Sequence, residues 1–109
     1  MLNYDFIFKK GILFVRLKGV INKNTSNLFT KEIDPLILDN GIRNVVFNVS
    51  ELNYIDEDGI SAFYKCYLKL KNESDISLCE IPLFLKDKFS FLLKYIRERE
   101  DEISILTKN

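Results

Sequence analysis

The chain has 109 residues, a length that suits one domain built around one hydrophobic core. Sixteen Lys and Arg residues balance sixteen Asp and Glu residues, so no net charge draws the protein toward nucleic acid or anionic lipid. No apolar run approaches the roughly 20 residues that span a membrane, and the first residues lack the layout of a signal peptide. We therefore expect a single cytoplasmic domain, residues 1–109, that recognises its partners through local surface features.

The residue types that metal sites and acid–base catalysis use most are scarce. The chain has no histidine, and its two cysteines, Cys66 and Cys79, lie in separate apolar segments at a spacing that matches no zinc or redox motif. We expect both cysteines to be buried, reduced thiols. Without histidine, the usual general base for a serine or cysteine nucleophile is missing. The composition therefore predicts no metal, no cofactor and no enzymatic activity.

Alternating polarity around a turn indicates the first two strands. Residues 3–9 and 12–18 each have the pattern of a strand, and Lys10-Gly11 between them suits a tight turn. Farther along, the β-branched run at residues 43–49 is typical of a central strand that is buried on both faces. We therefore expect an N-terminal hairpin and, after it, the middle strand of a sheet.

A first helix is expected between the hairpin and that central strand. A segment rich in capping residues, NKNTSN at 22–27, precedes it, and Asn40-Gly41 suits its C-terminal end. Pro35 has no amide hydrogen and clashes with the carbonyl four residues earlier, which predicts a kink or a break near Asp34. The apolar positions that recur at helical spacing are Phe29, Ile33, Leu36 and Ile37.

The second half of the chain continues the alternation of helices and strands. Apolar spacing predicts a second helix over residues 59–72 and a third over 85–96. Between them, residues 76–81 have the pattern of a strand that Pro82 stops, and residues 103–106 read as a last short strand. Because strands separated by helices need crossover connections, this order predicts an α/β fold with a mostly parallel sheet.

An unusual acidic segment, YIDEDGIS at residues 54–61, lies where the central strand passes into the second helix. Three adjacent carboxylates, Asp56, Glu57 and Asp58, precede Gly59. In parallel α/β sheets, binding sites gather beyond the carboxyl ends of the strands, at such strand-to-helix loops. The segment is therefore the first candidate for a functional site.

Several chemical uses of these carboxylates fit the sequence poorly. An EF-hand calcium loop aligned on Gly59 would have Tyr54 and Lys65 at its first and last ligand positions. A phosphate-binding loop would need more glycines and no repelling charge. A catalytic pair of Asp56 and Asp58 is formally possible, but it would have no cationic or amide partner nearby in sequence. A phosphoaspartate receiver domain would need a second acidic cluster after the first strand, where the chain has RLKG.

Helix capping explains part of the acidity. A carboxylate in the first turn satisfies free amides and complements the positive end of the helix dipole, for about 0.3–1 kcal/mol. One carboxylate is enough for a cap, whereas three adjacent ones crowd like charges together. The excess charge suggests a partner outside the chain.

The stretch VVFNVSELNYIDEDGISAF, residues 45–63, resembles the STAS domain, and within it the anti-sigma factor antagonists, also called anti-anti-sigma factors. The similarity also includes the hairpin that ends at Lys18-Gly19, the NTSN entry to the first helix, the strand at 76–81 and the last helix. It therefore extends over nearly the whole chain. It implies the STAS fold, with an N-terminal β-hairpin, a mostly parallel mixed sheet and three or four helices.

In that family the usual motif is Asp, Ser, Ser or Thr, Gly, and an anti-sigma factor that is also a serine kinase phosphorylates the hydroxyl before the glycine. The unmodified antagonist binds the kinase and frees the sigma factor. By this resemblance Asp56 and Gly59 match the motif, and Glu57 and Asp58 occupy the two hydroxyl positions. Asp58 has no hydroxyl to phosphorylate, so it either imitates the phosphorylated state or serves a different, basic partner.

Other residues near the acidic segment are candidates for the same surface. Ser61, one turn later, is a possible displaced phosphoacceptor, although helical spacing predicts that its side chain turns away from the loop. Asn22, Thr25 and Ser26 are expected to flank the site, either as caps of the first helix or as contacts for a partner.

The resemblance implies a bacterial regulatory module that binds a protein partner of the anti-sigma factor or serine kinase type. It implies no direct contact with nucleic acid and no insertion into a membrane, and the oligomeric state is either a monomer or a weak homodimer. The alternative is an adaptor subunit of a larger assembly, such as a stress-signalling complex or the cytosolic component of a membrane transporter.

Overall fold

A computed structural model describes residues 1–108 and contains one five-stranded sheet in the order β1-β2-β3-β4-β5. The first two strands are antiparallel, and the other neighbours run parallel. This arrangement confirms the predicted α/β fold. The strands are β1 (Leu2–Lys9), β2 (Ile12–Ile21), β3 (Asn44–Ile55), β4 (Asp75–Cys79) and β5 (Arg97–Arg99).

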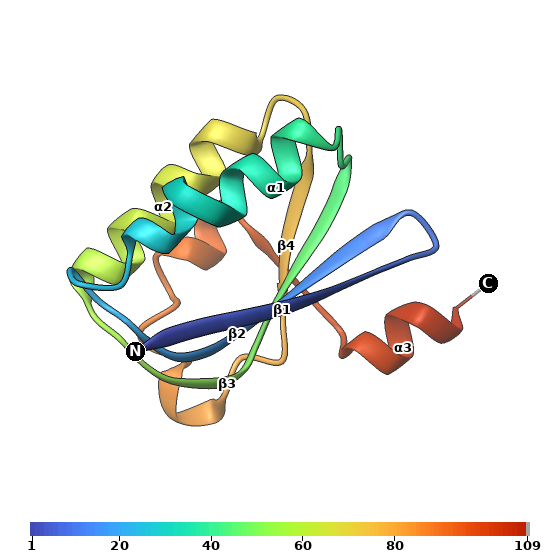
Figure 1. Ribbon diagram of the computed structural model, residues 1–109. Coiled ribbons are helices and arrows are strands. Elements are labelled where there is room, and N and C mark those ends of the chain that lie inside the picture. The colour runs from blue at the N-terminus through green and yellow to red at the C-terminus, as the bar shows by residue number, and fades with distance from the viewer. Residues whose placement is uncertain (109) are drawn as a thin grey trace.

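The helices lie on both faces of the sheet. Figure 1 shows α1 (Asp34–Asp39) and α2 (Glu57–Leu70) side by side on one face, and α3 (Glu102–Thr107) on the other. Within residues 1–108, no helix is both long and apolar enough to cross a membrane.

The predicted N-terminal hairpin is confirmed, and a two-residue turn joins its strands β1 and β2. Lys10 and Gly11 have φ values of 53° and 78°, which is the pattern of a two-residue type I′ turn. Such a turn matches the right-handed twist of the flanking strands and sets the pairing of Lys9 with Ile12. Local sequence therefore determines the register of β1 on β2.

The first helix is irregular near Asp34, where Pro35 led us to expect a kink or a break. A π-helical turn at Phe29–Ile33 leads directly into α1, and the Asp34 amide donates to the Phe29 carbonyl, five residues back. Pro35, the next residue, has no amide to continue an α-helical ladder from the preceding turn. The wider turn is the form that the predicted irregularity takes.

The prediction of a third helix over residues 85–96 is wrong, because this segment does not form a continuous α-helix. The structure has short 3-10 turns at Leu83–Leu85 and Leu92–Lys94 with irregular turns between them. The Asp87 carbonyl accepts from both the amide and the hydroxyl of Ser90, which competes with an α-helical ladder. The apolar stripe is nevertheless buried as expected, because its spacing suits a mixed series of turns as well as a helix.

The end of the chain also differs from the prediction. Residues 103–106 belong to helix α3 and not to a strand, and the last strand is the charged segment Arg97–Arg99. Asp101 caps α3 by accepting from the Ser104 amide at 2.8 Å. Ile105 then packs on the sheet, so the short apolar run is buried through one helix face.

The central strand is longer and its neighbour shorter than predicted. Strand β3 continues to Ile55, beyond the predicted end at residue 49, with register shifts against β2 that absorb the extra length. Strand β4 ends at Cys79 because Glu80 adopts a left-handed conformation with φ of 58°.

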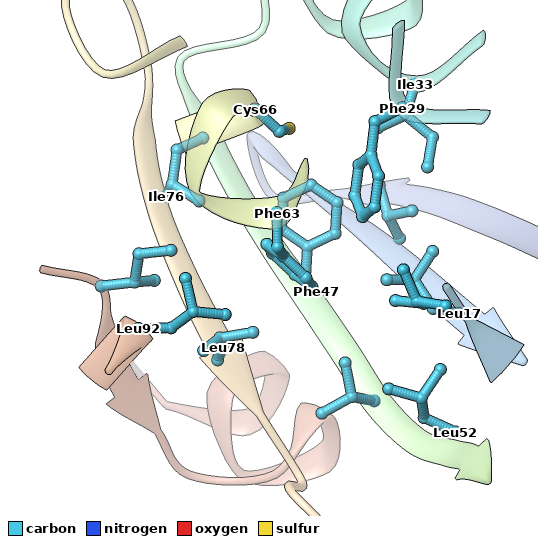
Figure 2. Close-up of a cluster of buried hydrophobic side chains, with 14 of the residues drawn as sticks. Leu17, Phe29, Ile33, Phe47, Leu52, Phe63, Cys66, Ile76, Leu78 and Leu92 are labelled. Atoms are coloured by element: carbon cyan, nitrogen blue, oxygen red, sulfur yellow. The ribbon is translucent and has the colours of Figure 1, made fainter. Parts of the chain in front are cut away.

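The main core lies between the sheet and helices α1 and α2, as Figure 2 shows. Phe63 of α2 lies 5.1 Å from both Phe29 and Phe47, measured between ring centroids. A smaller core under α3 includes Cys79, whereas Cys66 belongs to the main core. Both cysteines are buried and unpaired as predicted, and burial raises the pKa of the Cys79 thiol to about 12.

Candidate functional site

The acidic segment lies where β2 and β3 end side by side. Ile21 pairs with Ile55, and the Asp56 amide donates to the Ile21 carbonyl at 3.3 Å. The two strands are parallel, so their carboxyl ends bring the loop after Ile21 and the start of α2 to one edge of the sheet. This topology joins two segments that are far apart in the sequence.

Asp56 is the N-cap of α2. Its backbone is extended, with φ of −105° and ψ of −174°, and its Oδ1 accepts from the Gly59 amide at 2.8 Å. Its carbonyl accepts from Ile60, which begins the helical ladder. One carboxylate of the three is therefore used by the fold, as capping predicts.

Gly59 is required by a close approach of two backbones. A Cβ added at this position would lie 2.4 Å from the carbonyl oxygen of Ile21 and 2.8 Å from a side-chain carbon of Ile55. No larger residue fits without moving α2 away from the end of β2. The glycine thus sets how close the helix N-terminus lies to the sheet edge.

Glu57 and Asp58 have a different role from Asp56. Both are exposed in the first turn of α2, and within residues 1–108 neither side chain forms an ion pair or hydrogen bond. The positive end of the helix dipole partly offsets their mutual repulsion. Two carboxylates therefore face solvent with their hydrogen-bonding capacity free.

A cleft of about 370 Å³ begins beside Asp58 and runs between the first helix and α2. Ser26 and Ser61 line it together with Asp58, and Lys65 and Lys69 follow along α2. Ser61 was expected to turn away from the acidic segment. It does not turn away from Asp58, because residues three apart on a helix share a face. Ser61 is exposed and borders the same cleft as Asp58.

Asn22 and Thr25 hold the neighbouring loop in shape. The Asn22 Oδ1 accepts from the amides of Asn24 and Thr25 at 2.9 and 3.2 Å. The Thr25 hydroxyl donates to the Val20 carbonyl at 2.8 Å and accepts from the Asn22 amide at 2.9 Å. These bonds use the Asn22 side-chain oxygen and the Thr25 hydroxyl within the loop, whereas Ser26 lines the cleft.

The cleft also contains a residue that sequence reasoning did not single out as functional. Asp34 lines it, is 1% exposed, and lies 3.7 Å from the Lys69 ammonium. Burial raises the pKa of Asp34, and the charge of Lys69 only partly opposes this effect. The only sequence signal was an acidic residue at a predicted kink, which gave no reason to expect burial.

An aromatic cluster covers another part of α2. The Tyr64 ring lies 5.3 Å from Phe91 and 5.0 Å from Tyr95, and Tyr67 lies 6.1 Å from Tyr64, between centroids. Tyr64 and Tyr67 were expected only as apolar positions of the helix. Their phenol rings are half-buried, and the partner rings of the 3-10 turns are exposed.

Within residues 1–108, no group of three or more His, Cys, Asp or Glu side chains is arranged to hold a metal ion. What the site presents is a rigid helix N-terminus with free carboxylates beside a cleft lined by hydroxyls and lysines.

Comparison with known proteins defines the family. The chain matches the STAS domain over residues 3–92 and therefore belongs to the STAS domain family. It is 25% identical over 103 residues to an anti-sigma F factor antagonist of Paenibacillus polymyxa. The aligned region covers 91% of this chain and 87% of the relative. Strand β5 and helix α3 lie beyond the matched residues.

Solved structures share the fold at low sequence identity. An anti-sigma factor antagonist from Mycobacterium paratuberculosis superposes with a TM-score of 0.80 at 14% identity, covering 98% of this chain and 92% of that one. The Bacillus cell fate determinant SpoIIAA, in its phosphorylated form, superposes with a TM-score of 0.69 at 15% identity, covering 94% and 96% of the two chains. These structures show that the chain shares its fold with solved anti-sigma factor antagonists.

Proposed function

We propose that this protein binds an anti-sigma factor of the serine kinase type through the N-terminus of α2, and that Asp58 keeps this surface permanently charged. In this proposal the protein acts by binding and not by catalysis, and it controls sigma-factor-dependent transcription through that partner. The observation that carries the proposal is the pair of exposed, unused carboxylates, Glu57 and Asp58, on a helix start whose cap is already supplied by Asp56.

The position of Asp58 supports a role in switching. The family's phosphorylated hydroxyl precedes the glycine, and Gly59 is the residue that the close approach to Ile21 requires. Phosphorylation is a property of a relative, since SpoIIAA has been solved in its phosphorylated form. An aspartate carries one negative charge at neutral pH, against nearly two on a phosphoserine, so it imitates that state in part.

The energetic consequence depends on the surface of the partner. A kinase surface shaped for a neutral hydroxyl would leave the Asp58 carboxylate unpaired in the interface, which costs several kcal/mol. A partner with a basic surface would instead pair with Asp58 and Glu57 and bind more tightly. The first case gives a protein locked in a weakly binding state, and it is the case that we favour.

Affinity for the cognate anti-sigma factor tests this proposal. Asp58→Ser should bind at least about tenfold more tightly than the wild type, which corresponds to about 1.4 kcal/mol. Glu73→Ser is the matched control, because it removes an exposed carboxylate near the opposite end of α2. Equal affinities for Asp58→Ser and the wild type would exclude the locked state, and tighter binding by the wild type would indicate a basic partner.

Phosphorylation provides an independent measurement on the same proteins. After incubation with the kinase and ATP, phosphopeptide mass spectrometry should find modification at position 58 of the Asp58→Ser protein only. Phosphate on Ser61 of the wild type would show instead that the acceptor has moved one turn along the helix. A pull-down from native cell extract with the wild type and Asp58→Ser would identify the partner itself.

A further inference from the structure

The two edges of the sheet differ in how they are protected. Strand β5, at one edge, is a three-residue strand, Arg97–Arg99, whereas β1, at the other edge, has eight residues, Leu2–Lys9. Strand β1 pairs with β2 at every position without a bulge and contains no proline. Long, regular edge strands without such protection are templates for pairing with another strand.

The hairpin turn determines which backbone groups of β1 are free. In a two-residue hairpin the residues that flank the turn, here Lys9 and Ile12, exchange hydrogen bonds. Hydrogen-bonded and non-bonded pairs then alternate along the ladder. The amides and carbonyls of Phe8, Phe6 and Tyr4 therefore point away from β2, toward the open edge.

The same residues carry exposed aromatic side chains. Phe6 and Phe8 are 48% and 56% exposed, on the face of the sheet that packs against the main core. Figure 1 shows the turn end of the hairpin extending away from α1 and α2, which leaves this part of β1 uncovered. The free backbone edge and the exposed rings thus coincide.

We propose that the β1 edge is a homodimer interface, at which a second copy of the chain adds its own β1 antiparallel about a two-fold axis through Ile7. This register places Phe6 of each copy opposite Phe8 of the other, so that their free backbone groups can exchange hydrogen bonds. It also places Asp5 opposite Lys9, and the two Ile7 side chains together beside the smaller core.

Both this register and the neighbouring one, with its axis through Phe6, place aromatic rings opposite each other, but only this register places opposite charges together. Aromatic pairs and pairs of opposite charge both stabilise directly opposed positions on adjacent strands. If Phe6 faced its own copy instead, Lys9 would lie opposite Asn3 and have no carboxylate across the interface. Asp5 has Arg16 and Lys18 of its own chain at 3.3 and 3.2 Å in either register, so Lys9 is the charge that gains a partner. Within residues 1–108, Lys9 forms no ion pair, so its ammonium is available to the partner copy.

The overall charge favours self-association and does not interfere with the candidate site. The chain has no net charge, so no long-range repulsion separates two copies. Leu2 pairs with Gly19 and Lys9 with Ile12, so Phe6 and Phe8 lie toward the start of β2, whereas the acidic segment lies at its end. A dimer formed this way leaves the N-terminus of α2 free in both copies.

Sedimentation equilibrium of the purified full chain tests the interface without any partner. The wild type should show a concentration-dependent dimer, because one strand pair is smaller than the interfaces of roughly 1,200 Å² and more that hold stable complexes. Phe8→Lys and Lys9→Glu should each weaken the dimer at least about tenfold. Phe84→Lys is the control, since Phe84 is also exposed but follows β4, away from β1. A wild type that stays monomeric, or a control that weakens the dimer equally, would overturn the proposal.

Cysteine cross-linking tests the register. Positions 5 and 9 of one strand are roughly 13 Å apart, too far for an internal disulfide. An Asp5→Cys, Lys9→Cys double variant should therefore form a disulfide-linked dimer under mild oxidation. An Asn3→Cys, Lys9→Cys variant would cross-link only in the neighbouring register and should remain monomeric on a non-reducing gel. Cross-linking of the second variant in preference to the first would contradict the proposed pairing.

Discussion

Helices α2 and α3 begin with the same two residue types, and their caps have the same geometry. Asp56 and Asp101 are the N-caps, and each accepts a hydrogen bond of 2.8 Å from the amide three residues later. A glutamate follows in both cases, Glu57 in α2 and Glu102 in α3. Local sequence therefore makes these two helix starts alike.

The glutamates that follow the two caps differ in burial and in their partners. Glu102 is 7% exposed and accepts from the Arg16 guanidinium at 2.8 Å and from the Asn48 amide. Glu57 is exposed, and its carboxylate has no partner within residues 1–108. The charge beside the first cap is thus available to another protein, whereas the charge beside the second is used to hold α3 on the sheet.

The contrast can be tested first by removing each glutamate. Glu102→Ala should lower the free energy of unfolding by about 2 kcal/mol, because Arg16 and the buried Asn48 each lose one of two acceptors and α3 loses its attachment. Glu57→Ala should leave it almost unchanged. Urea denaturation followed by circular dichroism measures both, and a similar loss for the two variants would show that Glu57 also has a structural role.

The residues that donate to the two caps form a second matched pair. Gly59→Ala should destabilise the protein by about 2 kcal/mol, because the new methyl group would meet the Ile21 carbonyl. Ser104→Ala, at the equivalent position of α3, should have a small effect because a side chain is already present there. Thermal unfolding of both variants gives the comparison, which fails if Gly59→Ala unfolds at the wild-type temperature.

Removing the cap itself should have a smaller effect. Asp56→Ala should cost about 1 kcal/mol, since the Gly59 amide loses its acceptor, whereas Asp56→Asn should preserve most of the stability. Asp101→Ala should cost less, because α3 is short and its start is exposed. Chemical denaturation measures each variant. An Asp56→Asn protein as unstable as Asp56→Ala would indicate that charge and not capping is the main contribution.

The pH dependence of stability should report on the ion pair of the buried Glu102. Burial raises the pKa of Glu102, but hydrogen bonds from Arg16 and Asn48 outweigh this and hold it below its ordinary value of 4.5. A lowered pKa contributes stability above pH 4.5, and this contribution is lost as the pH falls through the folded-state value.

Glu102→Gln should therefore flatten the dependence of unfolding free energy on pH below about 4.5. Denaturation series from pH 3 to pH 7 measure the two slopes. Equal slopes for Glu102→Gln and the wild type would contradict the assignment of this ion pair.

The elements that depend on neighbouring residues could be predicted from the sequence. Lys10-Gly11 specifies its own turn, Asp56 specifies a helix start, and Pro35 specifies an irregularity, because each acts on backbone atoms within a few positions. The mostly parallel α/β sheet and the place of the acidic segment at a strand-to-helix joint follow from such signals in their order along the chain, whereas the STAS fold was implied by the resemblance of residues 45–63 to that family.

Tertiary contacts decided the rest. The stripe from Leu85 to Ile96 is compatible with a helix and with a series of turns, and packing selects the turns, with help from the local Asp87–Ser90 hydrogen bonds. The same is true of the run at 103–106, which packs on the sheet as a helix. A local pattern defines which side chains must be buried, but several backbone forms bury them equally well.

The sequence by itself determined the hairpin, the Asp56 cap and the number of carboxylates at the start of α2. Only the tertiary structure decided that Glu102 forms an ion pair with Arg16, whereas Glu57 and Asp58 have no partner within residues 1–108. It also decided that Ser61 lines the same cleft as Asp58. The physical reason is distance along the chain. Caps and turns join atoms a few residues apart, whereas the fate of a charge depends on partners that only folding brings near.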